Sequence, residues 1–532
     1  STLLASSAAS DVYKRQDDDN GRFSKDYNDI TNMTWSNILT YQTKIKKKHN
    51  LDLLAGYEIN SKESDGLGTT ISNFARWDKP EVNNGVVYQS MGGSNSTTRI
   101  VSYITRANYD YDNKYYLGAS WRTDGSSRLA RENRWGNFWS LSGAWRVSSE
   151  SFMKPLQNWL SDLKLRVSYG VNGTLPSSYY GYMGLSSLTS NYNDNPGITQ
   201  SQLENKELTW ETNYNFNSGI DLGFFDNRLN VTFEYYVRTT KNLLYSRPLS
   251  LATGFSSYLA NIGKLQNKGY ELEIRSTNIE TKDFRWSTSL NLGHNANKIL
   301  KLDGDLKQVT SGTSIHKVGL PYSTYYMIEF AGIDPVDGEP MFYKNTTDEN
   351  GNLNKETTKD PRSAEKVILQ CADPTITGGL GNSISYKWFD LNFNVNFSFG
   401  AWNYDGAAGK LEHGGDGTLN IPIYYRKRWQ KEGDETSIER FVVGRSISMT
   451  DYATTRRLYS GDYVRLKNLT FGFTLPKTWT RKVGIDNIRL YASGNNLLTW
   501  AAYDYIDPES GSSPSWDTPP MRTYTFGLEV KF

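Results

Sequence analysis

The sequence predicts an all-β fold, an antiparallel up-and-down transmembrane β-barrel, on three observations. Apolar and polar residues alternate with a period of two in many segments. Several of these segments are longer than the strands of soluble sheets, and aromatic residues, 14% of the chain, recur near their ends. A strand separates alternating residues onto two faces, whereas a helix would spread both kinds around its circumference.

Composition excludes several classes of function. The 532 residues include 59 Lys and Arg against 57 Asp and Glu, and this net charge of +2 predicts no nucleic-acid partner. No stretch is apolar enough to predict a membrane-spanning helix. The one cysteine, Cys371, excludes an internal disulfide framework and a cysteine-based zinc site.

The amino-terminal residues 1–20 are expected to be a disordered or non-native lead. Residues 11–16 resemble translated read-through at the end of a gene fragment, and the alternative is a genuine disordered lead, which Asp17, Asp18 and Asp19 would also suit. We therefore assign the barrel domain to residues 21–532 and expect the natural protein to begin upstream of Ser1.

The strands of the barrel follow one another along the chain. Alternation runs through 163–171 and 208–222, then resumes at 229–237 after an Asp/Asn turn at 225–228, which predicts a hairpin. Further strands are expected near 33–45, 49–60, 97–110, 114–123, 137–147, 270–276, 284–295, 376–386, 389–399, 463–475, 486–499 and 521–532. Tight turns alternate with long connections at 60–96, 240–266, 296–375 and 400–460, so the two rims are expected to differ.

Strand length and aromatic placement favour a membrane barrel over a soluble sandwich. Sandwich strands have about five or six residues, whereas a strand that crosses a bilayer needs about nine to eleven. Aromatic pairs on the expected lipid face are typical of a membrane interface. These pairs are Trp139 and Trp145, Trp210 and Tyr214, Phe284 and Trp286, and Tyr115 and Trp121.

The last strand is the sharpest local signal. Apolar residues alternate with polar ones up to the final residue of the chain, and such a strand resembles the assembly signal of Gram-negative outer-membrane barrels. The apolar set is Tyr524, Phe526, Leu528, Val530 and Phe532. A strand of this kind must pair with the first strand of its barrel, because lipid cannot solvate an open edge.

Several longer motifs then suggest a family. They are Gly-Asp-Tyr-Val-Arg-Leu-Lys-Asn-Leu-Thr at 461–470, Leu-Pro at 475–476, Ile-Arg-Leu-Tyr-Ala-Ser-Gly-Asn-Asn-Leu-Leu-Thr-Trp at 488–500 and Tyr-Ile-Asp-Pro-Glu at 505–509, with earlier matches at 261–263, 267–271, 332–335 and 338–340. Together they resemble the SusC/RagA-type TonB-dependent receptors of Bacteroidota.

The resemblance implies an incomplete barrel, roughly 14–16 strands of a 22-stranded one, as the carboxy-terminal portion of a receptor whose plug and TonB box are missing. It implies a place in the cell outer membrane, in contact with its lipid. It also implies uptake of an oligosaccharide or peptide, driven by the TonB complex through the plug, with a SusD-like surface lipoprotein as partner. The two alternatives are a passive porin and a soluble or surface all-β glycan-binding module.

Substrate contact is expected on aromatic residues of the long loops. The candidates are Tyr180, Tyr182, Trp402, Tyr404 and Tyr425, and loop packing or rim anchoring is the alternative for each. Lumen-facing polar residues such as Glu211, Asn213, Asn215 and Asp221 are expected to line the passage.

No catalytic, cofactor or metal site is predicted, so we expect a transporter and not an enzyme. The four histidines (His49, His294, His316 and His413) are scattered. The segment 348–352 resembles a calcium loop, but Leu353 occupies the position that such a loop reserves for glycine.

Overall fold

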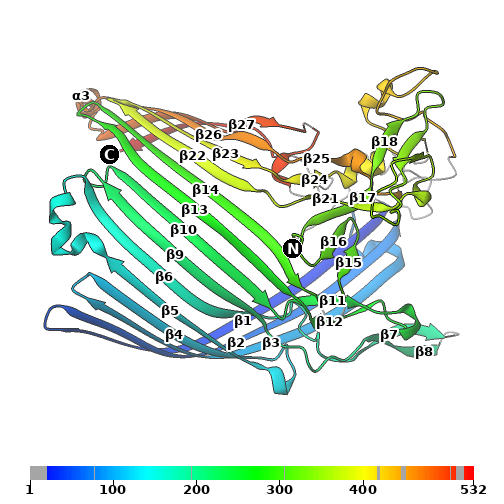
Figure 1. The fold of residues 1–532 in the computed structure, drawn as a ribbon, viewed down its shortest axis with the longest axis horizontal. Helices are drawn as coiled ribbons and strands as arrows, with labels where there is room; N and C mark the ends of the chain where they lie inside the picture. Colours follow the sequence, from blue (N-terminus) through cyan, green and yellow to red (C-terminus); the bar gives the residue numbers. More distant parts are fainter. Residues whose placement is uncertain are drawn as a thin grey trace.

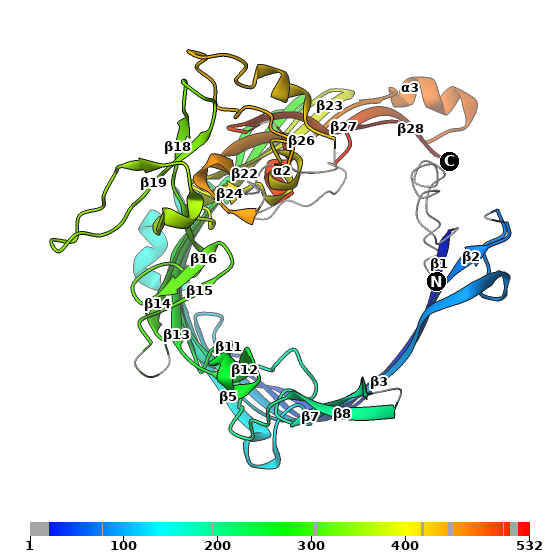
Figure 2. The ribbon, with the colours of Figure 1, turned by 90° about the vertical axis from the view of Figure 1, so that its right-hand side faces the viewer.

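In the computed structural model, one antiparallel sheet of 15 strands dominates the chain. The structure describes residues 21–532 except 77, 193–194, 303, 305, 416–419, 445–450, 504 and 511–519, so the expected lead at 1–20 lies outside the described residues. The sheet curls into most of a barrel wall, with β1 and β28 as its two edges (Figures 1 and 2).

Each strand of this sheet pairs with the next one along the wall, which confirms the predicted up-and-down barrel. In wall order the strands are β1 (Arg22–Ile45), β2 (His49–Phe74), β3 (Gly85–Tyr111), β4 (Tyr115–Ser126), β5 (Trp135–Arg146), β6 (Leu160–Thr174), β9 (Glu211–Phe224), β10 (Leu229–Lys241), β13 (Lys264–Glu280), β14 (Phe284–Lys301), β22 (Ile376–Tyr386), β23 (Phe389–Phe399), β26 (Tyr463–Thr474), β27 (Asn487–Ala501) and β28 (Thr523–Lys531).

The two rims differ, as the sequence predicts. Most connections at one rim are short, and several of them use left-handed backbone: at Lys46 and Lys47, at Asp112 and Asn113, at 225–227 and at Lys387. Asn and Asp tolerate this conformation better than other side-chain-bearing residues, which fits the turns at 112–113 and 226–227. The other rim carries the long connections, but the one expected at 60–96 is mostly strand, because β2 continues to Phe74 and β3 begins at Gly85.

The long connections form small sheets of their own, gathered at one end of the molecule (Figure 1). They contain β7 (Leu185–Tyr192) with β8 (Asn195–Gln202), β11 (Leu244–Pro248) with β12 (Ser257–Asn261), and β24 (Trp402–Tyr404) with β25 (Leu458–Ser460). The connection from β14 to β22 carries β15 (Gln308–Ser311), β16 (Ser314–Lys317), β17 (Thr324–Ile328) and β21 (Lys366–Cys371), and beside them β18 (Phe330–Ile333), β19 (Pro340–Tyr343) and β20 (Thr357–Thr358).

Helices are short. Among the described residues, the α-helices are α2 (Gly406–Leu411) and α3 (Lys477–Thr480). The 3₁₀ turns are η1 (Val82–Asn84), η2 (Arg131–Asn133), η3 (Val147–Ser149), η4 (Ser151–Leu156), η5 (Leu251–Thr253), η6 (Pro361–Ser363), η7 (Ile423–Lys427), η9 (Thr455–Arg457), η10 (Arg481–Val483) and η11 (Pro508–Ser510). In the part of the chain that the structure describes, no helix is long and apolar enough to cross a membrane.

The two faces of the wall differ in chemistry. Leu117, Leu141 and Val167 are exposed on the outer, convex face of adjacent strands, at 61%, 56% and 50%. Polar residues between them, such as Ser142 and Arg166, belong to the opposite, concave face, which we call the lumen face. A wall with an apolar outside and a polar inside is typical of barrels that face lipid.

One predicted strand begins later than its alternation suggests. Alternation starts at Leu208, but β9 begins at Glu211, because Leu208 and Trp210 turn inward and pack with Leu129 and Phe138 in a small core at the long-loop rim. Trp210 is 6% exposed and its indole N–H donates to the carbonyl of Arg134. The prediction that Trp210 faces lipid is therefore wrong. Alternation alone cannot distinguish a lipid face from a local core.

Candidate functional site

The lumen face carries a network of paired charges. Arg166 lies at its centre, with Nε 2.8 Å from an Asp221 carboxylate oxygen and Nη2 2.6 Å from Glu234. Arg489 pairs with Asp390 at 2.7 Å farther along the wall. The lumen wall is therefore charged, and the charges of these residues are largely neutralised by their neighbours.

Amide side chains fill much of the remaining lumen face. Asn213 accepts from the Thr240 hydroxyl at 2.6 Å, and Asn215 donates to Asn172 at 2.6 Å. Asn215 also accepts from Arg238 at 2.8 Å. The polar lumen lining predicted around Glu211, Asn213, Asn215 and Asp221 agrees with this arrangement. Such a wall offers hydrogen bonds of both senses to a hydrated solute.

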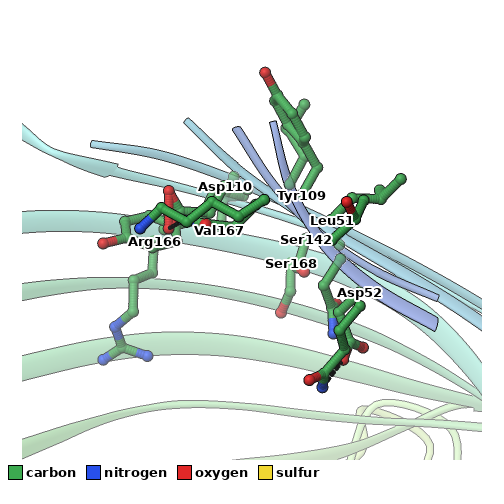
Figure 3. Close-up of a pocket in the computed structure, with 18 residues that line it drawn as sticks. Leu51, Asp52, Tyr109, Asp110, Ser142, Arg166, Val167 and Ser168 are labelled. Atoms are coloured by element: carbon green, nitrogen blue, oxygen red, sulfur yellow. Dashed lines mark hydrogen bonds between the residues drawn. The ribbon is translucent and has the colours of Figure 1, made fainter. Parts of the chain in front are cut away.

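The lumen face is hollowed in several places. One hollow of about 760 Å³ is lined by residues of six strands, and Figure 3 labels Asp52, Asp110, Arg166 and Ser168 among them. A second of about 760 Å³ is lined by Glu234, Glu271, Glu273 and Tyr463, with neighbours from β14, β22 and β23. These volumes lie within the range of about 300–1,000 Å³ that is usual for small-ligand sites.

Three of the predicted contact residues share one long loop. Trp402 and Tyr404 lie on β24, which pairs with β25, and Tyr425 lies in η7 of the same connection. Trp402 and Tyr404 are half-buried, whereas Tyr425 is 1% exposed and its hydroxyl donates to Glu439 at 3.0 Å. Tyr425 therefore lies beneath the loop surface, and contact with a substrate would require the loop to move.

A buried charge cluster holds this loop together. The guanidinium of Arg456 pairs with Glu439, whose side chain is fully buried. The same guanidinium lies 3.5 Å from a carboxylate oxygen of Glu412. Arg457, whose side chain is 4% exposed, lies 3.3 Å from the same Glu412. Tyr424 donates to Glu412 at 2.5 Å. Because each carboxylate has both an arginine and a tyrosine partner, the charges are compensated inside the loop.

Burial also shifts the pKa values of two titratable groups in this loop, Tyr424 and Asp405. Burial raises the pKa of Tyr424, and the hydrogen bond to Glu412 raises it further. The pKa of the Asp405 carboxyl is likewise raised, chiefly by burial. Asp405 nevertheless accepts hydrogen bonds from the Ala408 N–H at 2.7 Å and from the Tyr503 hydroxyl at 3.1 Å.

The other two predicted contact residues lie in a different loop, between β6 and β9. The Tyr180 hydroxyl accepts from the Thr97 N–H at 2.9 Å, and Tyr182 packs beside the core that contains Leu208 and Trp210. The structure thus groups the five predicted residues into two clusters. Their contact with a substrate stays a prediction.

Sequence reasoning missed a buried ion-pair lock at the end of the chain. Arg465 of β26, whose side chain is 3% exposed, lies 2.6 Å from Asp507 and 2.7 Å from Glu509. Lys467 adds a contact of 2.6 Å to Glu509. Two motifs quoted for the family resemblance, at 461–470 and 505–509, therefore meet in space. Their unlike charges were a signal that could have predicted the pairing.

An aromatic stack adjoins this lock. The rings of Tyr459 and Tyr503 are stacked with centroids 3.7 Å apart, and Tyr505 lies 5.3 Å from Tyr503 and 5.2 Å from Tyr424. The stack joins the connection between β23 and β26 to the one between β27 and β28. The two loops therefore form one packed unit above the lumen wall.

The segment 348–352, which resembles a calcium loop in sequence, is held by its own hydrogen bonds. Asp348 accepts from the N–H groups of Asn350 and Asn352 at 2.9 and 2.8 Å, so this segment is a hydrogen-bonded turn. Across the described residues, no group of three or more His, Cys, Asp or Glu side chains could hold a metal ion.

The predicted assembly signal lies on β28 and just beyond it. Tyr524, Phe526, Leu528, Val530 and Phe532 are exposed at 67%, 83%, 63%, 37% and 90%. β28 pairs with β27 over Asn487–Asn495. Their role in assembly stays a prediction.

The fold and its unequal rims define a class of protein, a membrane-type antiparallel barrel with elaborate loops at one end. The chain belongs to the family described as TonB dependent receptor-like, beta-barrel, whose model matches residues 2–497. The predicted likeness to SusC/RagA-type receptors is confirmed by individual relatives.

TonB-dependent receptor P3 of Formosa agariphila is 33% identical over 553 residues, which cover 96% of this chain and 53% of that protein. TonB-dependent receptor SusC of Bacteroides thetaiotaomicron is 30% identical over 461 residues, which cover 81% of this chain and 44% of that protein. The solved RagAB peptide transporter matches with a TM-score of 0.84 and 28% identity over 96% of this chain and 56% of that chain. The chain thus spans about half the length of these relatives.

Proposed function

We propose that this chain forms the barrel wall of an outer-membrane TonB-dependent receptor that imports a nutrient such as an oligosaccharide or a peptide. The observation that carries the proposal is the contrast between the two faces of the 15-stranded sheet. The outer face exposes apolar residues such as Leu117 and Leu141, while the lumen face carries paired charges around Arg166. Membership of the TonB-dependent receptor family supports it.

The proposed mechanism is transport and not catalysis. The long loops would capture the substrate beneath a SusD-like surface lipoprotein, and the TonB complex would act through a plug in a receptor of the relatives' length. Movement of the plug would then open the lumen to the solute. The neutralised lumen wall supports this step, because paired charges such as Arg166 with Asp221 leave few strong traps for a passing substrate.

An uptake assay tests the proposal. The full gene product is expressed in a Bacteroidota host that lacks its own receptor, with TonB present or deleted, and growth on candidate oligosaccharides or peptides is measured. We expect uptake to need both the receptor and TonB. TonB-independent uptake together with swelling of receptor-loaded liposomes would establish a passive porin instead.

A gel assay separates the membrane barrel from a soluble glycan-binding module. The full gene product should require detergent and migrate differently before and after heating, because a barrel resists unfolding in detergent. A protein that stays soluble in water and shows one mobility would contradict the proposal.

A further inference from the structure

The first three strands extend beyond their neighbour. β3 pairs with β2 along its whole length, from Gly85 to Tyr111, but β4 pairs with β3 only from Ile100 onward. Residues 85–99 of β3 therefore project past the end of β4 at the long-loop rim, where the blue strands of Figure 1 continue. Within the described residues, no strand pairs with this side of β3.

Hydrogen bonds at residues 97 and 99 show which way the backbone N–H and C=O groups of this edge point. The Arg99 N–H donates to the Ser127 hydroxyl at 2.9 Å, and the Arg99 carbonyl accepts from the Ser127 N–H at 2.9 Å. The Thr97 N–H donates to the Tyr180 hydroxyl at 2.9 Å. Backbone groups at 97 and 99 thus point away from β2.

The same direction repeats at every second residue, because backbone groups alternate along an antiparallel strand. The register between β2 and β3 is regular from Met91 to Arg99, and the one irregularity of this pair lies beyond Met91. The N–H and C=O groups of Met91, Gly93 and Asn95 therefore also point away from β2. These positions continue the edge beyond the Tyr180 cap.

The local sequence lacks the charged residues and prolines that usually prevent an exposed strand edge from pairing. No charged residue or proline occurs between Gly85 and Thr98. Met91 is 78% exposed and Tyr88 73%. Gly92 and Gly93 add no side chain, and a Cβ at Gly92 would meet no atom within 4 Å. Natural proteins usually protect exposed edges with charges, proline or covering segments, so an edge without them is suited to pairing.

We propose that the edge of β3 from Met91 to Asn95 binds an extended strand of the SusD-like lipoprotein, as an added strand of the sheet. The inference rests on the proposed function, which supplies that partner. Only an extended backbone offers N–H and C=O groups at the spacing of a strand edge. The edge stands at the rim that the proposed lipoprotein covers, and its lack of charge fits an uncharged partner strand.

Two substitutions at Gly93 test the contact. Gly93→Pro removes an N–H that points away from β2, so it deletes the docking donor without removing a bond of the β2–β3 ladder. Gly93→Ala is the matched control, because it keeps the N–H and its Cβ would meet only the Gly66 carbonyl oxygen, at 3.7 Å. In the full gene product we expect Gly93→Pro to weaken lipoprotein binding about tenfold, as the loss of one or two hydrogen bonds would. Binding by Gly93→Ala should stay within about twofold.

Hydrogen exchange on the unsubstituted complex gives a second readout. The Met91, Gly93 and Asn95 amides should exchange at least about tenfold more slowly when the lipoprotein is bound. Unchanged exchange with firm binding, or equal binding by both variants, would overturn the inference and leave the proposed function standing. Protection by a short uncharged peptide alone would make the edge a substrate site and overturn the choice of partner. A lipoprotein that does not bind the unsubstituted receptor would overturn both this inference and the proposed partnership.

Discussion

At the scale of single residues, the loops above the lumen are held together by buried ion pairs. Arg465 contacts Asp507 and Glu509, and Arg456 contacts Glu439, all with little exposure of the arginine. Buried pairs of this kind are costly to break, because the remaining partner is left as an uncompensated charge. Substitution of these arginines is thus expected to cost more stability than substitution of the half-buried tyrosines beside them.

Replacement of Arg465 tests the ion-pair lock. Arg465→Met leaves Asp507 without its guanidinium and Glu509 with Lys467 alone, so we expect a loss of about 3–5 kcal/mol in the stability of this loop. Limited proteolysis within 501–523 of the full gene product measures it. Lys477→Met is the control, because Lys477 and Asp486 are 63% and 46% exposed at 3.6 Å, and such a pair contributes at most about 1 kcal/mol. Equal cleavage of the two variants would contradict the lock.

The buried carboxyl of Asp405 should make the same region sensitive to pH. Burial raises the pKa of Asp405 above its ordinary value of 3.8, so the folded loop favours the protonated form. The stability that this preference contributes is complete below the unfolded pKa and is lost as pH rises through the folded-state pKa. Asp405→Asn cannot ionise, so it should gain stability relative to wild type as pH rises from about 3.8. Melting temperatures of both proteins across this window measure the difference, and a difference independent of pH would count against it.

At the scale of elements, a strand is defined by what its two faces touch. β28 exposes Phe526 on its outer side, at 83%, while its neighbour Thr525 pairs with Ser493 on the other face. Both residues share the backbone, the edge position and the distance from the chain end. They therefore form a matched pair for a test of which face meets lipid.

Phe526→Arg should impair insertion more than Thr525→Arg. A charge on the lipid face costs about 2–4 kcal/mol near the middle of the bilayer, whereas a lumen-facing charge stays hydrated. The fraction of the full gene product that migrates as a folded, unheated barrel measures the effect. An equal loss for both variants would show that β28 is sensitive to any charge and not to its face.

The alternating pattern predicted the strands of the wall but not their ends. The hairpin of β9 and β10 was predictable from alternation around the turn at 225–228. The extension of β2 to Phe74 was not, because the sequence beyond residue 60 no longer alternates clearly while backbone pairing with β1 and β3 continues. Hydrogen bonds between backbones do not depend on the side-chain pattern, so a strand can continue beyond the point where its residues stop alternating.

At the scale of the whole molecule, the wall has two edges. β1 and β28 each pair with one neighbour in the described sheet. β1 offers the longer edge, from Arg22 to Ile45, and an unpaired edge of this length is a template for pairing with other chains. Closure of the barrel is thus the main condition for stability.

Expression of residues 21–532 alone tests this condition. We expect the isolated wall to form oligomers in detergent, because open edges pair with edges of other copies. The full gene product should instead give a discrete species, and light scattering distinguishes the two. A monodisperse, heat-modifiable monomer of residues 21–532 would show that the edges close on each other.

The sequence by itself determined the architecture of this protein, since alternation, turn composition and strand length are properties of neighbouring residues. It also indicated the family through motifs such as that at 505–509. Only the tertiary structure decided that Arg465 meets Asp507 across 42 positions, that Tyr425 is buried against Glu439, and that the edge at Gly93 stays open. These contacts join distant segments through the closure of long loops, and no local pattern records which distant partners will meet.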